Sequence, residues 1–222
     1  MKLLHSFGPN PRIVRMFMLE KGITLPSEEV DILAGDNRKE GFLKRNPAGQ
    51  SPALELDDGT CIGEAMAICR YFEELHPNPP LMGTDAKDKA IVEMWEKRAN
   101  EEGMLAASEL FRNTHPAFAD RGLPGSAQPI GQLPELVVRA KARLGRFFKK
   151  FDAQLAQNEF VAGQRYSVAD PYLLVFWTWG RGPVLGFDMP RDFPNWTAHA
   201  RRMAKRPAVQ RAFAREEIAL PA

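Results

Sequence analysis

Asn46-Pro47-Ala48-Gly49-Gln50-Ser51-Pro52-Ala53-Leu54 is the stretch that decides the fold of this chain. Pro52 stands between a loop and a run of residues that reads as a β-strand. Proline cannot donate a hydrogen bond to a sheet, so it occurs at the first residue of a strand or on an edge strand. An X-Pro bond is also the one common place for a cis peptide. We therefore expect a cis bond at Ser51–Pro52, with the backbone N–H and C=O of Ser51 turned outward.

The residues after Pro52 extend this stretch into a binding site. An extended peptide can pair with the outward backbone groups of Ser51 like one added strand. Asp57-Asp58-Gly59-Thr60 is expected to return the chain as a hairpin, and Gly63-Glu64-Ala65 then begins a helix. A helix N-terminus attracts a carboxylate, and Glu64 beside it attracts an ammonium group. The pattern indicates a peptidic ligand with an amine and a carboxylate at one end.

The order of elements predicts an α/β thioredoxin-like domain followed by an all-α domain. His76-Pro77-Asn78-Pro79-Pro80 breaks any helix and indicates a linker between them. Ser167-x-x-Asp170 predicts the cap of an apolar helix at the centre of the second domain. In the first domain we expect strands at 2–6 and 30–32, a helix at 12–21 opened by Pro11, a short helix or loop at 36–45, and a helix at 64–75. The expected domain boundaries are 1–76 for the thioredoxin-like domain, 77–87 for the linker and 88–222 for the helical domain.

Composition excludes several classes of protein. The chain has 222 residues, 44% hydrophobic and 26% charged, which is ordinary for a globular protein. Its net charge of +2 gives no general attraction to nucleic acid or to a membrane surface. It shows neither a membrane-spanning run nor a secretory signal. Cys61 and Cys69 match no zinc or redox spacing. We expect a cytoplasmic protein with no metal and with no nucleic-acid or membrane partner.

The whole chain resembles the glutathione S-transferase family. The resemblance implies the glutathione transferase fold, glutathione as co-substrate and a homodimer. It is closest to bacterial and fungal members that lack the usual catalytic tyrosine, serine or cysteine. The matching motifs are Asn46-Pro47-x-Gly49-Gln50-x-Pro52-x-Leu54, Leu56-Asp57-Asp58-Gly59, Glu64-Ala65-x-Ala67-Ile68 with Tyr71, Phe160-Val161-Ala162-Gly163 and Tyr166-Ser167-Val168-Ala169-Asp170.

The resemblance implies roles for individual residues in binding glutathione. Ser51, before Pro52, pairs its backbone with the cysteinyl unit, and Gln50 touches the tripeptide. Glu64 holds the γ-glutamyl amine. Family members usually have a serine next, whereas this chain has Ala65, which keeps the backbone N–H and loses one donor. Two further cations, Arg38 and Lys39, lie where relatives hold the glycine carboxylate, although a solvated charged face explains them equally well.

The group that activates the thiol is less clearly marked. Activation means lowering the pKa of the glutathione thiol from about 8.5. Ser6 falls where tyrosine-type members keep their tyrosine, and Asn10 is a second donor. The positive end of the helix opened by Pro11 also lowers a thiol pKa without a side chain. His115 is a third candidate, acting through water, although a histidine before a proline is more often a surface residue.

The resemblance implies conjugation of the glutathione thiolate to a small hydrophobic electrophile, as in detoxification. We expect the electrophile pocket at Phe7, Pro9 and Phe111, with Trp177 or Trp179 nearby. The alternative is a non-catalytic or weakly catalytic glutathione-binding protein of the same fold. A thioredoxin-type oxidoreductase is excluded, because no cysteine stands at the start of the first helix.

Overall fold

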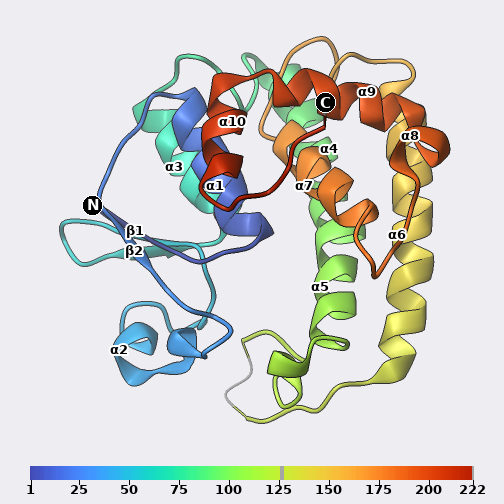
Figure 1. Cartoon of the computed structure of the whole chain (residues 1–222). Helices are drawn as coiled ribbons and strands as arrows, with labels where there is room; N and C mark the ends of the chain where they lie inside the picture. The colour runs from blue at the N-terminus through green and yellow to red at the C-terminus, as the bar shows by residue number, and fades with distance from the viewer. Residues whose placement is uncertain (126–127, 222) are drawn as a thin grey trace. The chain divides into compact units, whose positions relative to one another are not determined.

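The computed structural model describes residues 1–125 and 128–221, which form two compact units (Figure 1). The first, here called the sheet unit, consists of Met1–Pro79 and Arg112–Leu133. The second, the helical unit, consists of Pro80–Phe111 and Pro134–Ala222. Segment 112–133 therefore groups with the sheet, although it lies within the stretch expected to form the helical domain. The boundaries at 76 and 88 stay a prediction.

A four-stranded mixed sheet with the order β2–β1–β3–β4 forms the centre of the sheet unit. Strand β1 pairs in parallel with β2 and antiparallel with β3, and β4 runs antiparallel to β3. This is the thioredoxin-like arrangement expected from the sequence. The strands are β1 (Lys2–His5), β2 (Ser27–Glu29), β3 (Ala53–Glu55) and β4 (Cys61–Gly63).

Helices cover both faces of this sheet. Successive side chains of a strand point to opposite faces of the sheet, so Leu3 and Leu4 of β1 pack against helices on opposite faces. Leu4 packs with Ala53, Val30 and Phe42 of α2 (Glu40–Leu43). Figure 1 shows helices α1 (Pro9–Glu20) and α3 (Ala65–Leu75) together on one side of the strands and α2 on the other.

The second strand lies three residues before its expected position, so that prediction was wrong. Val30 still extends the pairing, because its N–H donates to the carbonyl of His5 at 2.7 Å. At Asp31 the chain turns, since the carboxylate accepts from the N–H groups of Leu33 and Ala34, both at 2.9 Å. Aspartate competes with the sheet for backbone donors in this way, and the run 30–32 cannot continue as a strand.

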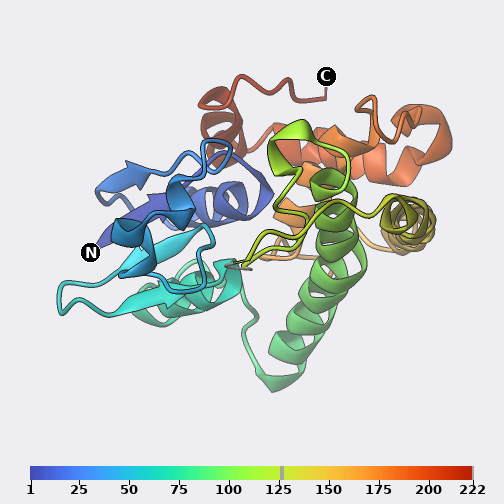
Figure 2. The same ribbon diagram turned by 90° about the horizontal axis from the view of Figure 1, so that it is seen from below.

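The helical unit is built around one long rod, the green helix in Figure 2. The rod contains α4 (Ala86–Arg98), a π-helical segment (Ala99–Met104) and α5 (Leu105–Arg112). Among the described residues no helix has the length and apolar character needed to cross a bilayer. The remaining helices are α6 (Pro134–Leu155), α7 (Asp170–Gly180), α8 (Met189–Asp192), α9 (Pro194–Ala204) and α10 (Pro207–Ala214).

Aromatic rings fill the core of the helical unit against the π-helical segment. The ring of Phe147 lies 4.7 Å from that of Phe176 and 5.5 Å from that of Trp196, measured between centroids. Gly103 admits these rings, because a Cβ atom there would lie 2.6 Å from Cζ of Phe147 and 2.8 Å from Cζ of Phe176. The π-helical segment and this glycine were not expected from the sequence.

Candidate functional site

The loop before β3 has the expected geometry. The Ser51–Pro52 peptide is cis, which confirms the prediction. The loop is held by Asn46, whose carbonyl accepts from the Gly49 N–H at 2.9 Å and whose Nδ2 donates to the Gln50 carbonyl at 2.8 Å. The side chain of Gln50 is exposed, and Ser51 is half-buried. The loop is thus fixed by its backbone while Gln50 remains accessible to a ligand.

Glu64 stands at the junction of β4 and α3 in an unusual backbone conformation. Its φ and ψ angles are 64° and 127°, and its side chain is exposed. Left-handed φ values at residues other than glycine cost of order 1–3 kcal/mol and concentrate at functional sites. The first N–H groups of α3, from Ala65 on, have no partner within the helix. A carboxylate beside free N–H groups suits a ligand that carries both an ammonium and a carboxylate.

A 3₁₀ turn at Asp36–Arg38 borders the same loop. Asn37 joins the two, because its Nδ2 donates to the Gly49 carbonyl at 2.6 Å. Lys39 is 73% exposed and forms an ion pair with Asp36 at 2.6 Å, which raises the pKa of Lys39. Arg38 is half-buried, and its guanidinium makes no hydrogen bond or ion pair within the described residues. Of the two predicted cations, Arg38 is therefore the one still available to an anion.

Helix α1 begins at Pro9, two residues before the expected start, with Gly8 as its N-cap at a φ of 132°. Pro9 and Pro11 have no N–H, and the Arg12 N–H donates to the Gly8 carbonyl at 3.2 Å. Asn10 therefore keeps the one unpaired N–H among the first four helical residues, judged within the described part of the chain. The start of α1 therefore offers one backbone donor, the Asn10 N–H, and the positive end of the helix dipole.

Cationic side chains lie behind the start of α1. Arg15 is buried, and its Nη1 lies 3.4 Å from both the carbonyl of Ser6 and Nδ1 of His5. Burial lowers the pKa of Arg12 to about 10, so this residue stays charged at neutral pH. Ser6 itself is 2% exposed, whereas Phe7 is 56% exposed. The Ser6 hydroxyl is thus largely shielded from solvent, while Phe7 is exposed and Gly8 to Asn10 are half-buried.

His115 serves the local structure of segment 112–133. It precedes a 3₁₀ turn at Pro116–Phe118, and its Nδ1 accepts from the Ala117 N–H at 3.2 Å. Its carbonyl accepts from Nε2 of Gln132 at 2.9 Å. A neutral imidazole that accepts at Nδ1 carries its proton on Nε2. His115 therefore has a structural task whether or not it also takes part in chemistry.

Phe111 belongs to the helical unit, where its ring lies 6.1 Å from that of Trp179. Trp177 is buried in that unit, and its Nε1 donates to Oγ1 of Thr197 at 3.1 Å. Trp177 is thus a core residue. Phe7 and Pro9 lie in the sheet unit, and the electrophile pocket stays a prediction.

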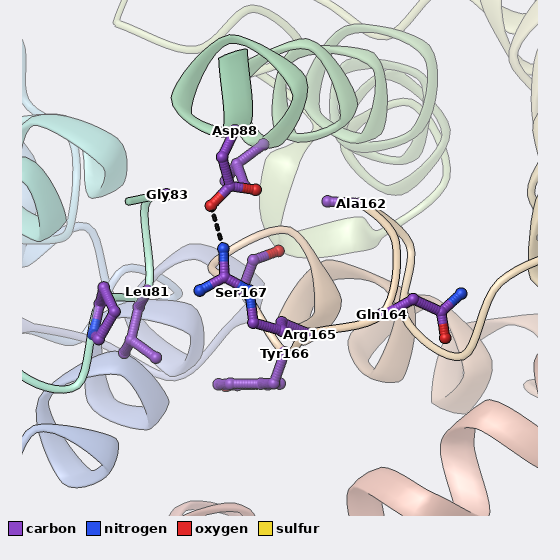
Figure 3. Close-up of a pocket in the computed structure, with 10 residues that line it drawn as sticks. Leu81, Gly83, Asp88, Ala162, Gln164, Arg165, Tyr166 and Ser167 are labelled. Atoms are coloured by element: carbon purple, nitrogen blue, oxygen red, sulfur yellow. Dashed lines mark hydrogen bonds and ion pairs between the residues drawn. The ribbon is translucent and has the colours of Figure 1, made fainter. Parts of the chain in front are cut away.

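A cavity of about 70 Å³ lies in the helical unit at the start of α4 (Figure 3). Asp88 accepts there from the Thr84 N–H at 2.9 Å and from the side chain of Arg165. These hydrogen bonds satisfy polar groups at the N-terminus of α4. We therefore assign the residues around the cavity a role in the local structure of that helix start. None of the predicted site residues lines it; its lining is Pro80, Leu81, Gly83, Asp88, Val92, Ala162, Gln164, Arg165, Tyr166 and Ser167.

Two arginines that no sequence motif marked lie in the sheet unit beside the predicted site. Arg121 donates from Nη1 to the Ile32 carbonyl at 2.9 Å and from Nη2 to the Leu33 carbonyl at 2.8 Å. Arg112 in turn donates from Nη1 to the Arg121 carbonyl at 3.0 Å. The partners of Arg121 are distant in the sequence, so no local pattern predicts these contacts.

Known proteins resemble the chain over nearly its whole length. Residues 7–75 match the family model of the glutathione S-transferase N-terminal domain, and residues 114–207 match that of the C-terminal domain. Glutathione S-transferase 2 of Saccharomyces cerevisiae is 29% identical, with 92% of this chain and 85% of that protein aligned.

Solved structures of glutathione S-transferases also resemble this chain. A glutathione S-transferase domain-containing protein of Marinobacter aquaeolei superposes with a TM-score of 0.81 at 32% identity, covering 94% of this chain and 100% of that one. A sphingomonad glutathione S-transferase complexed with glutathione superposes with a TM-score of 0.77 at 29% identity, covering 99% of this chain and 100% of that one.

Proposed function

Because the chain belongs to the glutathione S-transferase family, we propose that it binds glutathione in the sheet unit and transfers the thiolate to a small hydrophobic electrophile. The left-handed backbone at Glu64, next to the free N–H groups of α3, is the observation that carries this proposal. Glu64 holds the γ-glutamyl ammonium, and the backbone of Ala65 holds the γ-glutamyl carboxylate. Ser51 pairs its backbone with the cysteinyl unit. Gln50 contacts the tripeptide from the same loop.

The start of α1 activates the thiol in this proposal. Its positive end, the Asn10 N–H and the buried charge of Arg12 all stabilise a thiolate. The thiol proton leaves to solvent. The sulfur then donates an electron pair to an electrophilic carbon of the substrate, and the bond to the leaving group breaks with its electrons. Ser6 and His115 are auxiliary donors, because one is shielded and the other is engaged in its own turn.

Family membership also supports a homodimer and a cytoplasmic role in detoxification as parts of the proposal. The competing function is a protein that binds glutathione without chemistry. It is favoured by Ala65 in place of serine, and by the lack of tyrosine or cysteine between His5 and Arg12.

Two assays separate these functions. The protein is first tested for retention on immobilised glutathione, and then for conjugation of glutathione to 1-chloro-2,4-dinitrobenzene. Retention with turnover is expected. Retention without turnover of any electrophile in a broad panel would identify the binding protein, and absence of retention together with absence of turnover would overturn both functions.

Ser6→Ala is expected to lower kcat by no more than about tenfold, or about 1.4 kcal/mol. The reason is that several groups share the stabilisation of the thiolate and that the hydroxyl is shielded from solvent. Steady-state kinetics at saturating glutathione measure the effect. A loss of a thousandfold or more would instead make Ser6 an indispensable catalytic hydroxyl.

A further inference from the structure

Helices α1 and α3 begin at the same edge of the sheet. Strand β3 runs antiparallel to β1 and to β4, so β1 and β4 point in the same direction. Helix α1 follows β1 and α3 follows β4, and the two helices pack against each other on one side of the strands (Figure 1). Their N-termini therefore lie at one edge of the sheet and their C-termini at the opposite edge.

The proposed function uses both N-termini at once. The start of α1 stabilises the thiolate, while Glu64 and the start of α3 hold the γ-glutamyl end. Both groups belong to one ligand, so the offset of the two helices along their axes has to match the distance between the thiol and the γ-glutamyl group. A misplacement of about 1 Å costs about a hundredfold in rate, even when its cause lies far from the reacting atoms.

Lys21 connects the two helices at the opposite edge, where both of them end. Lys21 is the C-cap of α1. Its side chain is 0% exposed, and its Nζ lies 2.7 Å from Oε2 of Glu73 near the end of α3. The same Nζ donates to the carbonyl of His76, the C-cap of α3, at 2.6 Å and to the carbonyl of Pro79 at 2.7 Å. A lysine ammonium has three donors, so all of them are used here.

This buried ammonium fixes the relative position of the two helix ends. Apolar burial is non-directional, whereas three short contacts from one Nζ specify where the end of α1 lies against the end of α3. Replacing a buried ion pair by apolar side chains of similar volume is often neutral for stability, and its best-attested role is to fix a register. A shift at Lys21 is transmitted across the 12 residues of α1 to its start, because a helix rises by a constant amount of about 1.5 Å per residue.

We propose that Lys21 is a positioning residue for the transfer reaction, whose ammonium sets the axial offset of α1 and α3 and thereby aligns the thiolate-binding and γ-glutamyl-binding helix starts. This role rests on the proposed function and adds to it a residue at the edge of the sheet opposite the site. Lys21 acts without touching glutathione. The competing role for the same contacts is stabilisation of the fold alone.

Two ligands distinguish alignment of the two helix starts from binding at one of them. Glutathione needs both, whereas ophthalmic acid, which has a methyl group in place of the thiol, needs the γ-glutamyl side alone. By calorimetry, Lys21→Met is expected to weaken glutathione about tenfold more than ophthalmic acid. The absorbance of bound thiolate should show a thiol pKa raised toward about 8.5. Lys97→Met, which removes an exposed ion pair with Glu101, is the matched control and should behave like the wild type.

A second variant separates positioning from stability. Lys21→Met deprives the Glu73 carboxylate of the ammonium and is expected to lower the urea midpoint of unfolding. Lys21→Met/Glu73→Met replaces the pair by apolar side chains and should recover much of that midpoint. The thiol bound to this double variant should keep the raised pKa, because the ammonium that sets the offset is still missing. Recovery of both the midpoint and the wild-type thiol pKa would assign Lys21 to stability alone and overturn the proposal.

The two ligands provide further outcomes that decide the matter. Equal loss of affinity for glutathione and ophthalmic acid, with an unchanged thiol pKa, would show a general disturbance of the site and overturn the proposal. Wild-type affinities and a wild-type thiol pKa in Lys21→Met would overturn it as well. A wild type that binds neither ligand would overturn the proposed function and, with it, the role of Lys21.

Discussion

Asp170→Ala is expected to lower the free energy of unfolding by about 3–5 kcal/mol, the cost of leaving a buried partner unpaired. The Oδ1 atom of Asp170 accepts from the Val161 N–H at 2.9 Å and lies 2.8 Å from Nε2 of His199. Its Oδ2 atom accepts from the Ser167 N–H at 2.8 Å. Asp170 and His199 are both 0% exposed, so water cannot replace the lost acceptor. One carboxylate thus holds the start of α7, the turn before it and helix α9 together.

Urea denaturation followed by circular dichroism measures this effect. Asp120→Ala is the matched control, since that side chain is exposed, and its unfolding free energy should change by less than about 0.5 kcal/mol. Asp170→Asn keeps one acceptor and should fall between the two. A wild-type midpoint for Asp170→Ala would show that Val161, Ser167 and His199 find other partners.

Glu64→Gln is expected to weaken glutathione binding by about tenfold to a hundredfold, because a hydrogen bond to a charged group contributes about 1.5–3 kcal/mol. The substitution keeps the size of the side chain and removes the charge that faces the γ-glutamyl ammonium. The exposure of Glu64 in the free protein means that folding does not depend on its charge. The unfolding midpoint should therefore stay close to that of the wild type.

Calorimetric titration with glutathione measures the loss of affinity. Glu74→Gln, an exposed glutamate of α3, serves as the control and should bind like the wild type. N-acetylglutathione, which lacks the ammonium, should bind the wild type and Glu64→Gln equally. Equal affinity of both proteins for glutathione itself would remove Glu64 from the site.

The parts of the site predicted from the sequence share one physical basis. Pro52, the turn at Asp57–Thr60 and the helix start after Glu64 are short-range signals, because proline, glycine and helix-end chemistry act within a few residues. The resemblance to a family then gave these residues their roles. The positive φ at Glu64 has no marker of its own in the sequence.

The parts that were missed depend on long-range packing or on competition between local signals. Strand β2 ends before the expected strand because the chain turns at Asp31, whose carboxylate accepts from the N–H groups of Leu33 and Ala34. The π-helical segment occurs where the rings of Phe147 and Phe176 pack against Gly103. The periodicity of apolar residues in the sequence does not predict this contact. Arg121 donates to the carbonyl of Ile32, which is distant in the sequence, and Arg112 donates to the carbonyl of Arg121 within the same segment. Side-chain charge alone does not predict such partners.

The pKa of the glutathione thiol bound to the wild-type protein tests the central claim most directly. It is read from the absorbance of the thiolate as a function of pH, with glutathione at saturation. The positive end of α1, the Asn10 N–H and the buried Arg12 favour the charged form, so the bound thiol is predicted to titrate clearly below the value of about 8.5 of a free thiol. A bound thiol that titrates at the solution value would contradict activation at the start of α1 and leave a protein that binds glutathione without transferring it.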